Sequence, residues 1–284
     1  MSWTMCRWVW QLKSPLHIGW LPAGALNRTR LYVPARALWG TLTAELARRQ
    51  SRTFPDYKAV GQRLLEHTRL SYLFPAEPVG GEWKAWLPQY QENRGLVWIR
   101  EDGKTEEDCP FRMRLLSTRP GTAIESVSDT AAEGTLREFE AIHPYWCDGD
   151  DLPKPVAMVG YLFCKDVALE QELKAIQEIF LGGDTRYGLG RLIRVDCSHA
   201  TSFFQGAEVD LGTPEPVVRI GFAMAHTRMD GLSGVIGAME CIAGWDMVTG
   251  GLKAGELTWT PGSCWTEKRH CAVQEDGLWQ IQPA

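Results

Sequence analysis

Four glycines and two arginines are concentrated in one short stretch, Phe180 to Arg191, with the sequence FLGGDTRYGLGR. Glycines grouped in this way let the backbone adopt positive φ angles and approach another chain or a ligand closely. Exposed backbone amides and arginine side chains are both typical contacts for phosphate oxygens. The stretch is therefore a candidate phosphate-binding loop, and its candidate RNA contacts are Gly182, Gly183, Thr185, Arg186, Tyr187, Gly188, Gly190 and Arg191.

The elements on either side of this loop limit the ligand that it could hold. Apolar residues at helical spacing predict a helix over residues 167–180, and residues 192–195 have the pattern of a short strand. The usual nucleotide-binding fingerprints need the order strand, loop, helix, and no Gly-Lys-Ser/Thr follows the glycines. A mononucleotide site is therefore not expected. On spacing alone, a glycine-capped helix end followed by a tight turn explains the stretch better than a binding loop does.

Three further groups of polar side chains are candidates for RNA contacts. They lie in a loop over residues 20–33, at the start of a helix predicted over residues 35–49, and in a polar arm after residue 111. The loop suits contacts to splayed bases, and the helix start offers amides to phosphates. The arm is either a solvated hairpin or a basic finger along an RNA backbone, and the sequence favours neither. The candidates in these groups are Asn27, Arg28, Arg30, Arg36, Arg112, Arg114 and Arg119.

Composition excludes some classes of protein and leaves others open. The chain has 284 residues with 44% hydrophobic composition, so it can bury a substantial core. Its net charge of -5 argues against non-specific nucleic-acid binding by bulk charge, but a local basic groove is compatible with it. Eight cysteines without a CxxC pair and the absence of a long apolar span predict a cytoplasmic protein with reduced thiols and no membrane contact.

Metal and cofactor sites have little support in the sequence. A zinc site would have to use Cys264, His270 and Cys271 together with a distant fourth ligand, because no second pair lies at the familiar spacing. We therefore expect neither a metal nor a cofactor. Thirteen tryptophans are many for this length, and we expect most of them to be core or interface anchors, with stacking on bases as a minority role.

The order of elements predicts an α+β fold. Strands over residues 7–13 and 156–164 are separated by the helix over 35–49 and a long excursion, and a helix and a strand follow. This order is close to a ferredoxin-like βαββαβ sheet with helices on one face. We predict that this domain covers residues 1–198, with an arm at about 92–150.

The remaining residues are harder to assign. Residues 199–284 are predicted to be a C-terminal β-rich extension or a second small domain, with a strand over 217–224 and a hairpin-like pair over 257–259 and 278–281. Within the excursion we expect a helix over 57–68, a loop rich in proline and glycine around 75–81, and an exposed turn over 101–110.

Four of these features, in this order, resemble the RAMP superfamily of CRISPR-associated proteins. They are the first strand with PLHIG at residues 15–19, the phrase LYVPARALWG at 31–40, the arm at 121–140, and the glycine loop at 182–191. The likeness covers roughly residues 7–198. It implies a ferredoxin-like RNA-recognition domain that binds CRISPR RNA in a multi-subunit type III or type III-derived effector complex. Implied partners are RAMP-family backbone subunits, a large or nuclease subunit, and target RNA indirectly.

Residues 14–34 decide which subunit the chain resembles. Backbone subunits that cut target RNA carry an aspartate in this loop, whereas the loop here contains no Asp and no Glu. Without a carboxylate or a metal-ligand set, we expect no catalytic residue and no enzyme activity. The resemblance then fits a single-copy subunit that caps the complex and holds the 5′ handle of the guide. A cleavage-dead backbone subunit along the spacer is the close alternative.

Two functions of other classes remain open. Repeat-cleaving endonucleases of the family often use a histidine near the N-terminus, and His17 could act as a metal-independent base with Arg28 or Arg30 stabilising the phosphorane. A structural role for His17 is favoured, since non-catalytic members carry the same PLHIG strand end. The other possibility is an adaptor whose tryptophan-rich N-terminus docks on a large subunit without touching RNA.

Overall fold

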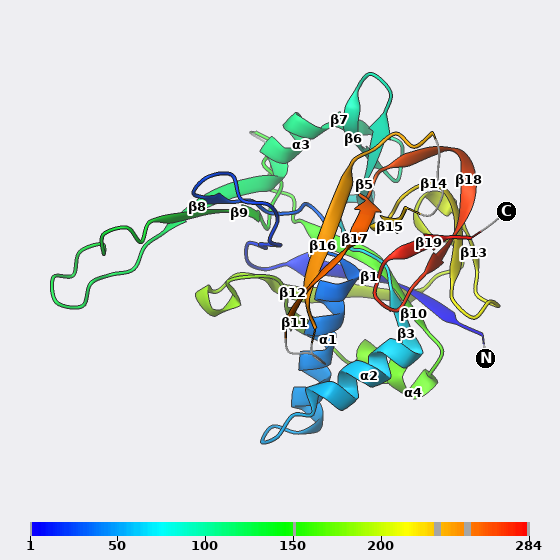
Figure 1. The fold of residues 1–284 in the computed structure, drawn as a ribbon, viewed down its shortest axis with the longest axis horizontal. Coiled ribbons are helices and arrows are strands. Elements are labelled where there is room, and N and C mark those ends of the chain that lie inside the picture. The colour runs from blue at the N-terminus through cyan, green and yellow to red at the C-terminus, as the bar shows by residue number, and fades with distance from the viewer. Residues whose placement is uncertain (1, 150–151, 230–233, 247–250, 283–284) are drawn as a thin grey trace.

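The computed structural model describes residues 2–149, 152–229, 234–246 and 251–282 (Figure 1). Two large sheets form the body, and a two-stranded arm projects from it along the longest axis of the molecule. Among the described residues, no helix is both long and apolar enough to span a membrane.

The core of the first sheet has ferredoxin-like topology. Its four central strands are β12 (Arg191–His199), β1 (Thr4–Leu12), β10 (Ala157–Cys164) and β3 (Thr68–Leu70), antiparallel and side by side in that order. In chain order this is the 4-1-3-2 arrangement of a βαββαβ unit. The predicted α+β fold with a ferredoxin-like domain is therefore confirmed.

Helices cover one face of this sheet, and every second side chain of β1 points to that face. Trp8 and Trp10 point to the face covered by α1 (Ala35–Gln50), α2 (Tyr57–His67) and α4 (Val167–Lys174), and both tryptophans are almost fully buried. Glu170 of α4 accepts hydrogen bonds on this face from Thr4 and Cys6 of β1. The tryptophans of β1 are therefore core anchors, as expected.

Further strands extend this sheet on both sides. Beyond β10 it continues through β4 (Phe74–Val79), β5 (Glu82–Gln91), β6 (Gly95–Arg100) and β7 (Thr105–Glu107), and at the other edge β11 (Glu178–Phe180) pairs with β12. The prediction of a loop around residues 75–81 is wrong, because most of these residues belong to β4. Pro75 and Pro78 are tolerated there because β4 pairs with β10 only over residues 74–76 and with β5 only over 76–79.

A second sheet packs on the face opposite the helices. It contains seven strands in the order β13, β14, β18, β19, β15, β17 and β16. Their bounds are Glu208–Asp210 (β13), Val217–Phe222 (β14), Thr227–Arg228 (β15), Met239–Asp246 (β16), Gly251–Trp259 (β17), Cys264–Val273 (β18) and Trp279–Ile281 (β19). The predicted hairpin-like pair is wrong, because β15 separates β17 from β19.

One hydrophobic core joins the two sheets. Phe203, just before the short 3-10 helix Phe204–Gly206, has its ring 4.6 Å from that of Tyr161 in β10 and 6.1 Å from that of Trp279 in β19. Core residues of both sheets form one contiguous buried cluster. The predicted boundary near residue 198 therefore stays a prediction, since the core runs across it.

The arm is a hairpin of β8 (Leu116–Gly121) and β9 (Arg137–Ile142), and its base is widened by β2 (Leu26–Asn27). The preceding residues differ from the prediction. Instead of an exposed turn and an extended start of the arm, Asp108–Leu115 form helix α3, which carries Arg112 and Arg114. Phe111, fully buried on this helix, stacks 4.4 Å from Trp98, and such packing outweighs the weak helical pattern of a segment this short.

The element before the glycine loop also differs from the prediction. Helix α4 ends at Lys174, and Glu178–Phe180 form β11 rather than its last turn. Ile176 and Ile179 are buried in both descriptions, so their spacing could not distinguish a helix from an edge strand. The glycine loop therefore closes a β-hairpin between β11 and β12 and is not a capped helix end.

Candidate nucleic-acid interface

The glycine loop over residues 181–190 is held against the chain just after β1. The amide of Gly190 donates to the carbonyl of Pro15 at 2.8 Å, and the amide of Gly183 donates to the carbonyl of His17 at 2.9 Å. Leu181 and Leu189 are buried beneath the loop. These amides are already used within the protein, so the predicted phosphate contacts of the loop have to come from other groups.

Close packing explains why two of the glycines are required. Gly190 has φ 73°, and a Cβ atom there would lie 1.9 Å from the carbonyl oxygen of Leu181. Gly182 has φ 91°, and its Cβ would lie 2.3 Å from the carbonyl oxygen of His17. Gly188 also has a positive φ, of 84°, but faces open space. The first two glycines allow a close approach, whereas Gly188 serves only the turn after the 3-10 helix Thr185–Tyr187.

The tight loop displays Arg186 and Tyr187 to solvent. Arg186 is exposed and has no ion pair or hydrogen bond within the described parts of the chain. Tyr187 is 71% exposed, and the guanidinium of Arg137, from the base of the arm, lies 4.9 Å from the centre of its ring. Arg137 also approaches the Asp184 carboxylate at 3.7 Å. We call Arg186, Tyr187 and Arg137, together with the exposed and unpaired Arg119 on β8, the hairpin face.

Other predicted contacts lie near this face but are partly engaged. Arg191 donates to Glu178 across the β11–β12 pair at 2.5 Å. Asn27 Nδ2 donates to the carbonyl of Glu138 on β9 at 3.3 Å, which ties the 20–33 loop to the arm. The guanidinium of Arg28 lies 4.3 Å above the ring of Trp20. The structure thus brings the glycine loop, the arm and the 20–33 loop together on one side of the molecule (Figure 1).

Arg30 lies inside the protein instead of on this surface. Its side chain is about 12% exposed and forms a bidentate ion pair with Glu240 of β16. Burial alone would raise the pKa of Glu240, but hydrogen bonds from Arg30 and His226 outweigh it and lower this pKa to about 2. His226 in turn contacts the Tyr72 hydroxyl at 2.8 Å. Arg30 therefore joins the first sheet to the second.

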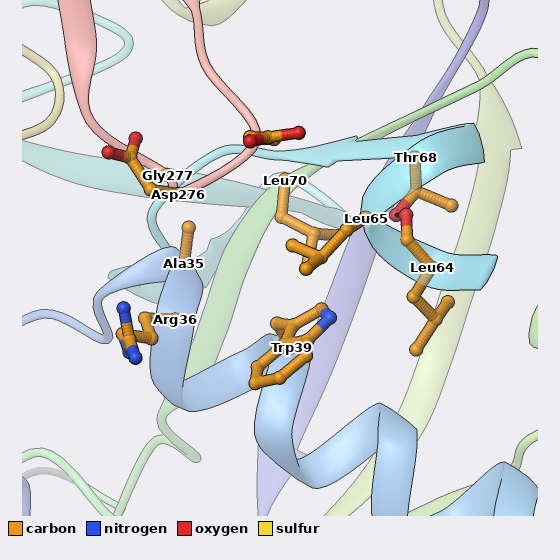
Figure 2. Close-up of a pocket in the computed structure, with 10 residues that line it drawn as sticks. Ala35, Arg36, Trp39, Leu64, Leu65, Thr68, Leu70, Asp276 and Gly277 are labelled. Atoms are coloured by element: carbon orange, nitrogen blue, oxygen red, sulfur yellow. Dashed lines mark hydrogen bonds between the residues drawn. The ribbon is translucent and has the colours of Figure 1, made fainter. Parts of the chain in front are cut away.

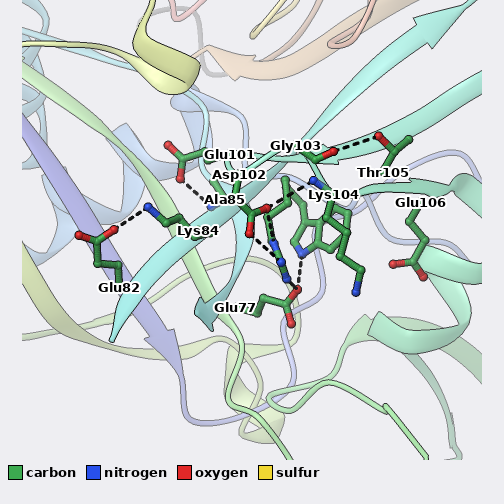
Figure 3. A network of polar contacts seen from close by, with 12 residues as sticks. Glu77, Glu82, Lys84, Ala85, Glu101, Asp102, Gly103, Lys104, Thr105 and Glu106 are labelled. Carbon is green, nitrogen blue, oxygen red and sulfur yellow. Dashed lines mark hydrogen bonds and ion pairs between the residues drawn. The ribbon is translucent and has the colours of Figure 1, made fainter. Parts of the chain in front are cut away.

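Arg114 lies in a dense network of carboxylates. It donates to Glu106 at 2.5 Å and to Asp148 at 2.6 Å, and it lies 3.7 Å from Glu77. Glu77 is 2% exposed and also binds Arg100 and the indole of Trp86, as Figure 3 shows. We call β4–β7, α3 and the adjoining Asp148 the carboxylate lobe, because carboxylates within this set pair with its arginines.

Arg112 and Arg36 also have acidic neighbours. Arg112 of α3 donates to Asp108 one turn earlier at 2.7 Å. Arg36 stands at the start of α1 beside a pocket of about 170 Å³, and the loop with Asp276 and Gly277 crosses this helix start (Figure 2). A Cβ on Gly277 would lie 2.5 Å from that of Ala35. Acidic side chains close to the helix start oppose the phosphate contact predicted there.

His17 is held in a structural environment. Its Nδ1 lies 2.7 Å from the carbonyl oxygen of Glu140, so this nitrogen carries the proton and donates it. Its ring packs edge-on to Phe139 and against Gly183. The Glu140 carboxylate, close by, accepts from the amide of Thr29 at 3.1 Å. The 14–34 loop thus receives a carboxylate from β9, but that carboxylate is already bound to the backbone.

The zinc site considered from the sequence does not fit the structure. Cys264 and Cys271 lie on the same extended strand, β18, seven residues apart, which corresponds to roughly 23 Å. One ion cannot contact both. In the parts of the chain that the structure describes, no three His, Cys, Asp or Glu side chains are grouped closely enough to hold a metal.

Sequence reasoning missed two side chains of this surface. Arg137 follows the predicted arginines of the arm by 18 residues or more in the chain, and the folded arm brings it next to Arg119 through the β8–β9 pairing and over the ring of Tyr187. Trp20 was not singled out from the other tryptophans, but it is only half-buried, with Arg28 and Arg112 over its ring. A tryptophan followed by a loop with two arginines was the available signal for the second case.

The fold defines an α+β protein with a ferredoxin-like core. No family model and no curated protein matches this sequence. The solved structures that share its fold include two of the type III-B Cmr-beta complex. One is bound to cognate target RNA and AMPPnP, with TM-score 0.57 and 14% identity, and the other is bound to cognate target RNA, with TM-score 0.57 and 15% identity. Each match covers 93% of this chain and 86% of the matched chain. The chain thus has the fold of a type III-B Cmr-beta complex chain.

Proposed function

We propose that this chain binds CRISPR RNA as a subunit of a type III-like RNA-guided complex, and that it caps the repeat-derived 5′ handle of the guide without cutting RNA itself. The fold likeness supports a place in such a complex. The hairpin face carries the proposal, because it holds guanidinium groups at the surface with few or no internal carboxylate partners. Such groups bind phosphates, and binding releases counterions.

The rigid mounting of Arg186 supports a role in binding. The loop beneath it is fixed by backbone hydrogen bonds to residues 15–17 and by glycines that tolerate no side chain. A preorganised cation loses little conformational freedom when it meets a phosphate. Tyr187, exposed beside it, offers a ring on which a base or a ribose can stack.

The choice of a cap over a backbone subunit rests on the second sheet. The 199–284 region adds a complete seven-stranded sheet to the ferredoxin-like domain and shares its core. An addition of this size is easier to accommodate at the end of an assembly than in a repeating stack. The non-catalytic role rests on the absence of acidic residues in 14–34.

Exchange of one arginine tests the proposal. Arg186→Ala should weaken binding of guide RNA several-fold and reduce the slope of log affinity against log salt by about 0.7, because one phosphate contact is lost. Arg52→Ala removes the same charge from an exposed, unpaired arginine in the α1–α2 connection, distant from the arm in Figure 1, and is the matched control. Equal effects of the two substitutions would remove Arg186 from the site.

Incubation with repeat RNA tests the non-catalytic role. The purified chain without metal should leave the RNA intact. Discrete cleavage products that disappear with His17→Ala would instead establish a repeat-processing endonuclease.

Crosslinks from the hairpin face to the 5′ end of bound guides are expected of a cap, whereas crosslinks throughout the spacer would indicate a backbone subunit.

A further inference from the structure

A pocket of about 160 Å³ opens beside the loop that carries Trp20, where the two sheets meet. Its wall comes from residues 20–32, from β5 and β6, from α3 and from the start of β16. We propose that this pocket receives one unstacked nucleobase of the bound RNA. The proposal rests on the RNA-binding function proposed above and identifies the part of the RNA that this surface takes.

The size and lining of the pocket fit a single planar ring system. Its volume is below the roughly 300–1,000 Å³ of pockets that hold drug-sized ligands. Aromatic side chains supply much of the wall, namely Trp20, Tyr32, Tyr90 and Trp98. Bases that leave a stack are typically bound on rings of this kind, and stacking tolerates any base because every base has a π-face.

Two guanidinium groups lie beside Trp20, which lines the pocket. Arg28 lies 4.3 Å and Arg112 lies 5.8 Å from the centre of the Trp20 ring. Arg112 is paired with Asp108, whereas Arg28 has no carboxylate partner among the described residues. A nucleotide brings its own phosphate beside its base, so an unpaired cation beside Trp20 complements it. An apolar peptide side chain would leave this cation without a counter-charge.

Polar atoms line the inner wall. Arg30 and Glu240 contribute their ion pair, and the hydroxyl of Thr260 lies beside that of Tyr90, which also lines the pocket. Base edges carry both donors and acceptors and can interact with such groups.

One loop connects the pocket to the hairpin face. The loop that places Trp20 at the pocket also pairs with β9 through Leu26 and Asn27, and Arg137 of β9 contacts Tyr187. An RNA strand held by its phosphates on the hairpin face would follow this loop to the pocket.

A comparison of two probes separates base binding from phosphate binding. The full-length chain is titrated by fluorescence anisotropy with an adenylate 12-mer and with an abasic ribose-phosphate 12-mer that has the same phosphates. Wild type should bind the adenylate probe about tenfold more tightly, as expected for one stacked base. Trp20→Ala should abolish most of this preference at unchanged abasic affinity, and Trp20→Phe, which keeps a ring, should retain it.

The variants also distinguish this inference from the proposed function. Arg186→Ala should weaken binding of both probes alike and leave the preference intact. A wild-type chain that binds both probes equally, with the Arg186 effect present, would refute the base pocket and keep the RNA-binding function. Failure of wild type to bind either probe would refute both. If Trp20→Ala spares both affinities but abolishes co-purification with partner subunits, the pocket is a protein-docking site and the base assignment is wrong.

Discussion

The carboxylate lobe and the hairpin face use the same side chain for opposite purposes. In the lobe, Arg100 and Arg114 are 13% and 18% exposed, and each has at least two carboxylate partners. On the hairpin face, Arg119 and Arg186 are exposed and unpaired within the described residues. An arginine marks a binding surface only where the fold leaves its charge uncompensated. The difference lies in the neighbouring carboxylates and not in the arginines.

Removal of the central carboxylate of the lobe should have the largest effect. Glu77→Ala leaves Arg100 without its buried partner and the Trp86 indole without an acceptor, so the free energy of unfolding should fall by about 3–5 kcal/mol. Urea unfolding measures this loss. Glu107→Ala, which removes one partner of the half-exposed Arg94 pair, should cost at most about 1 kcal/mol. Similar losses of unfolding free energy for Glu77→Ala and Glu107→Ala would contradict the difference expected between a buried and an exposed ion pair.

Acid should remove the stabilisation that the buried pair of Arg30 and Glu240 provides. The pKa of Glu240 is about 2 in the folded chain, below the ordinary glutamate value of about 4.3. The Glu240 carboxylate therefore stabilises the fold fully above about pH 4.3, and this stabilisation is lost as the pH falls from about 4.3 toward 2. The expected contribution is about 3 kcal/mol. The stability gap between wild type and Glu240→Gln, measured by thermal unfolding, should close across this pH window. A constant gap would show that protonation of Glu240 does not matter.

Within the hairpin face, glycine geometry predicts a smaller loss. Gly190→Ala forces a Cβ atom against the Leu181 carbonyl and should destabilise the chain by about 1–3 kcal/mol, with weaker RNA binding as the loop shifts. Gly188→Ala has a similar φ but open space, so it should cost about 1 kcal/mol and spare binding. Calorimetry combined with RNA titration checks both. A larger loss of stability for Gly188→Ala than for Gly190→Ala would contradict the conclusion that Gly190, and not Gly188, is required by close packing.

Substitution of an arginine without an internal partner should have the smallest effect on stability. Arg119→Ala should change the free energy of unfolding by no more than about 0.5 kcal/mol, because it breaks no internal contact. It should still weaken RNA binding several-fold at low salt and much less at high salt. Denaturant unfolding and anisotropy at two salt concentrations provide the test. A loss of stability without a loss of binding would place Arg119 with the arginines of the lobe.

Periodicity predicted the core of the fold but not its short elements. β1, α1 and β10 are long or strongly patterned, and all three were found from sequence. α3 and β11 were missed because eight and three residues carry too little pattern to outweigh tertiary packing.

The candidate site was predicted in outline only. The glycine loop was found, since glycines at close approaches are visible in the sequence. Arg112 and Arg114 each have a partner within eight residues, but other partners lie far away in the chain: Glu240 is 210 residues from Arg30, and Asp148 is 34 residues from Arg114. Charge compensation over such separations is a property of the folded chain and leaves no local signal.

The central position of β1 has a consequence for synthesis of the chain. Its two neighbours are β10 and β12, so the strand cannot complete its hydrogen bonding until about residue 199 has left the ribosome. At about 5–20 residues per second, Trp8 and Trp10 then wait about 10–40 s without their native partners. Contacts between such distant segments form slowly, and an unpaired strand with two tryptophans is prone to aggregate. Nascent chains of this protein should therefore depend strongly on chaperones that shield an N-terminal apolar segment.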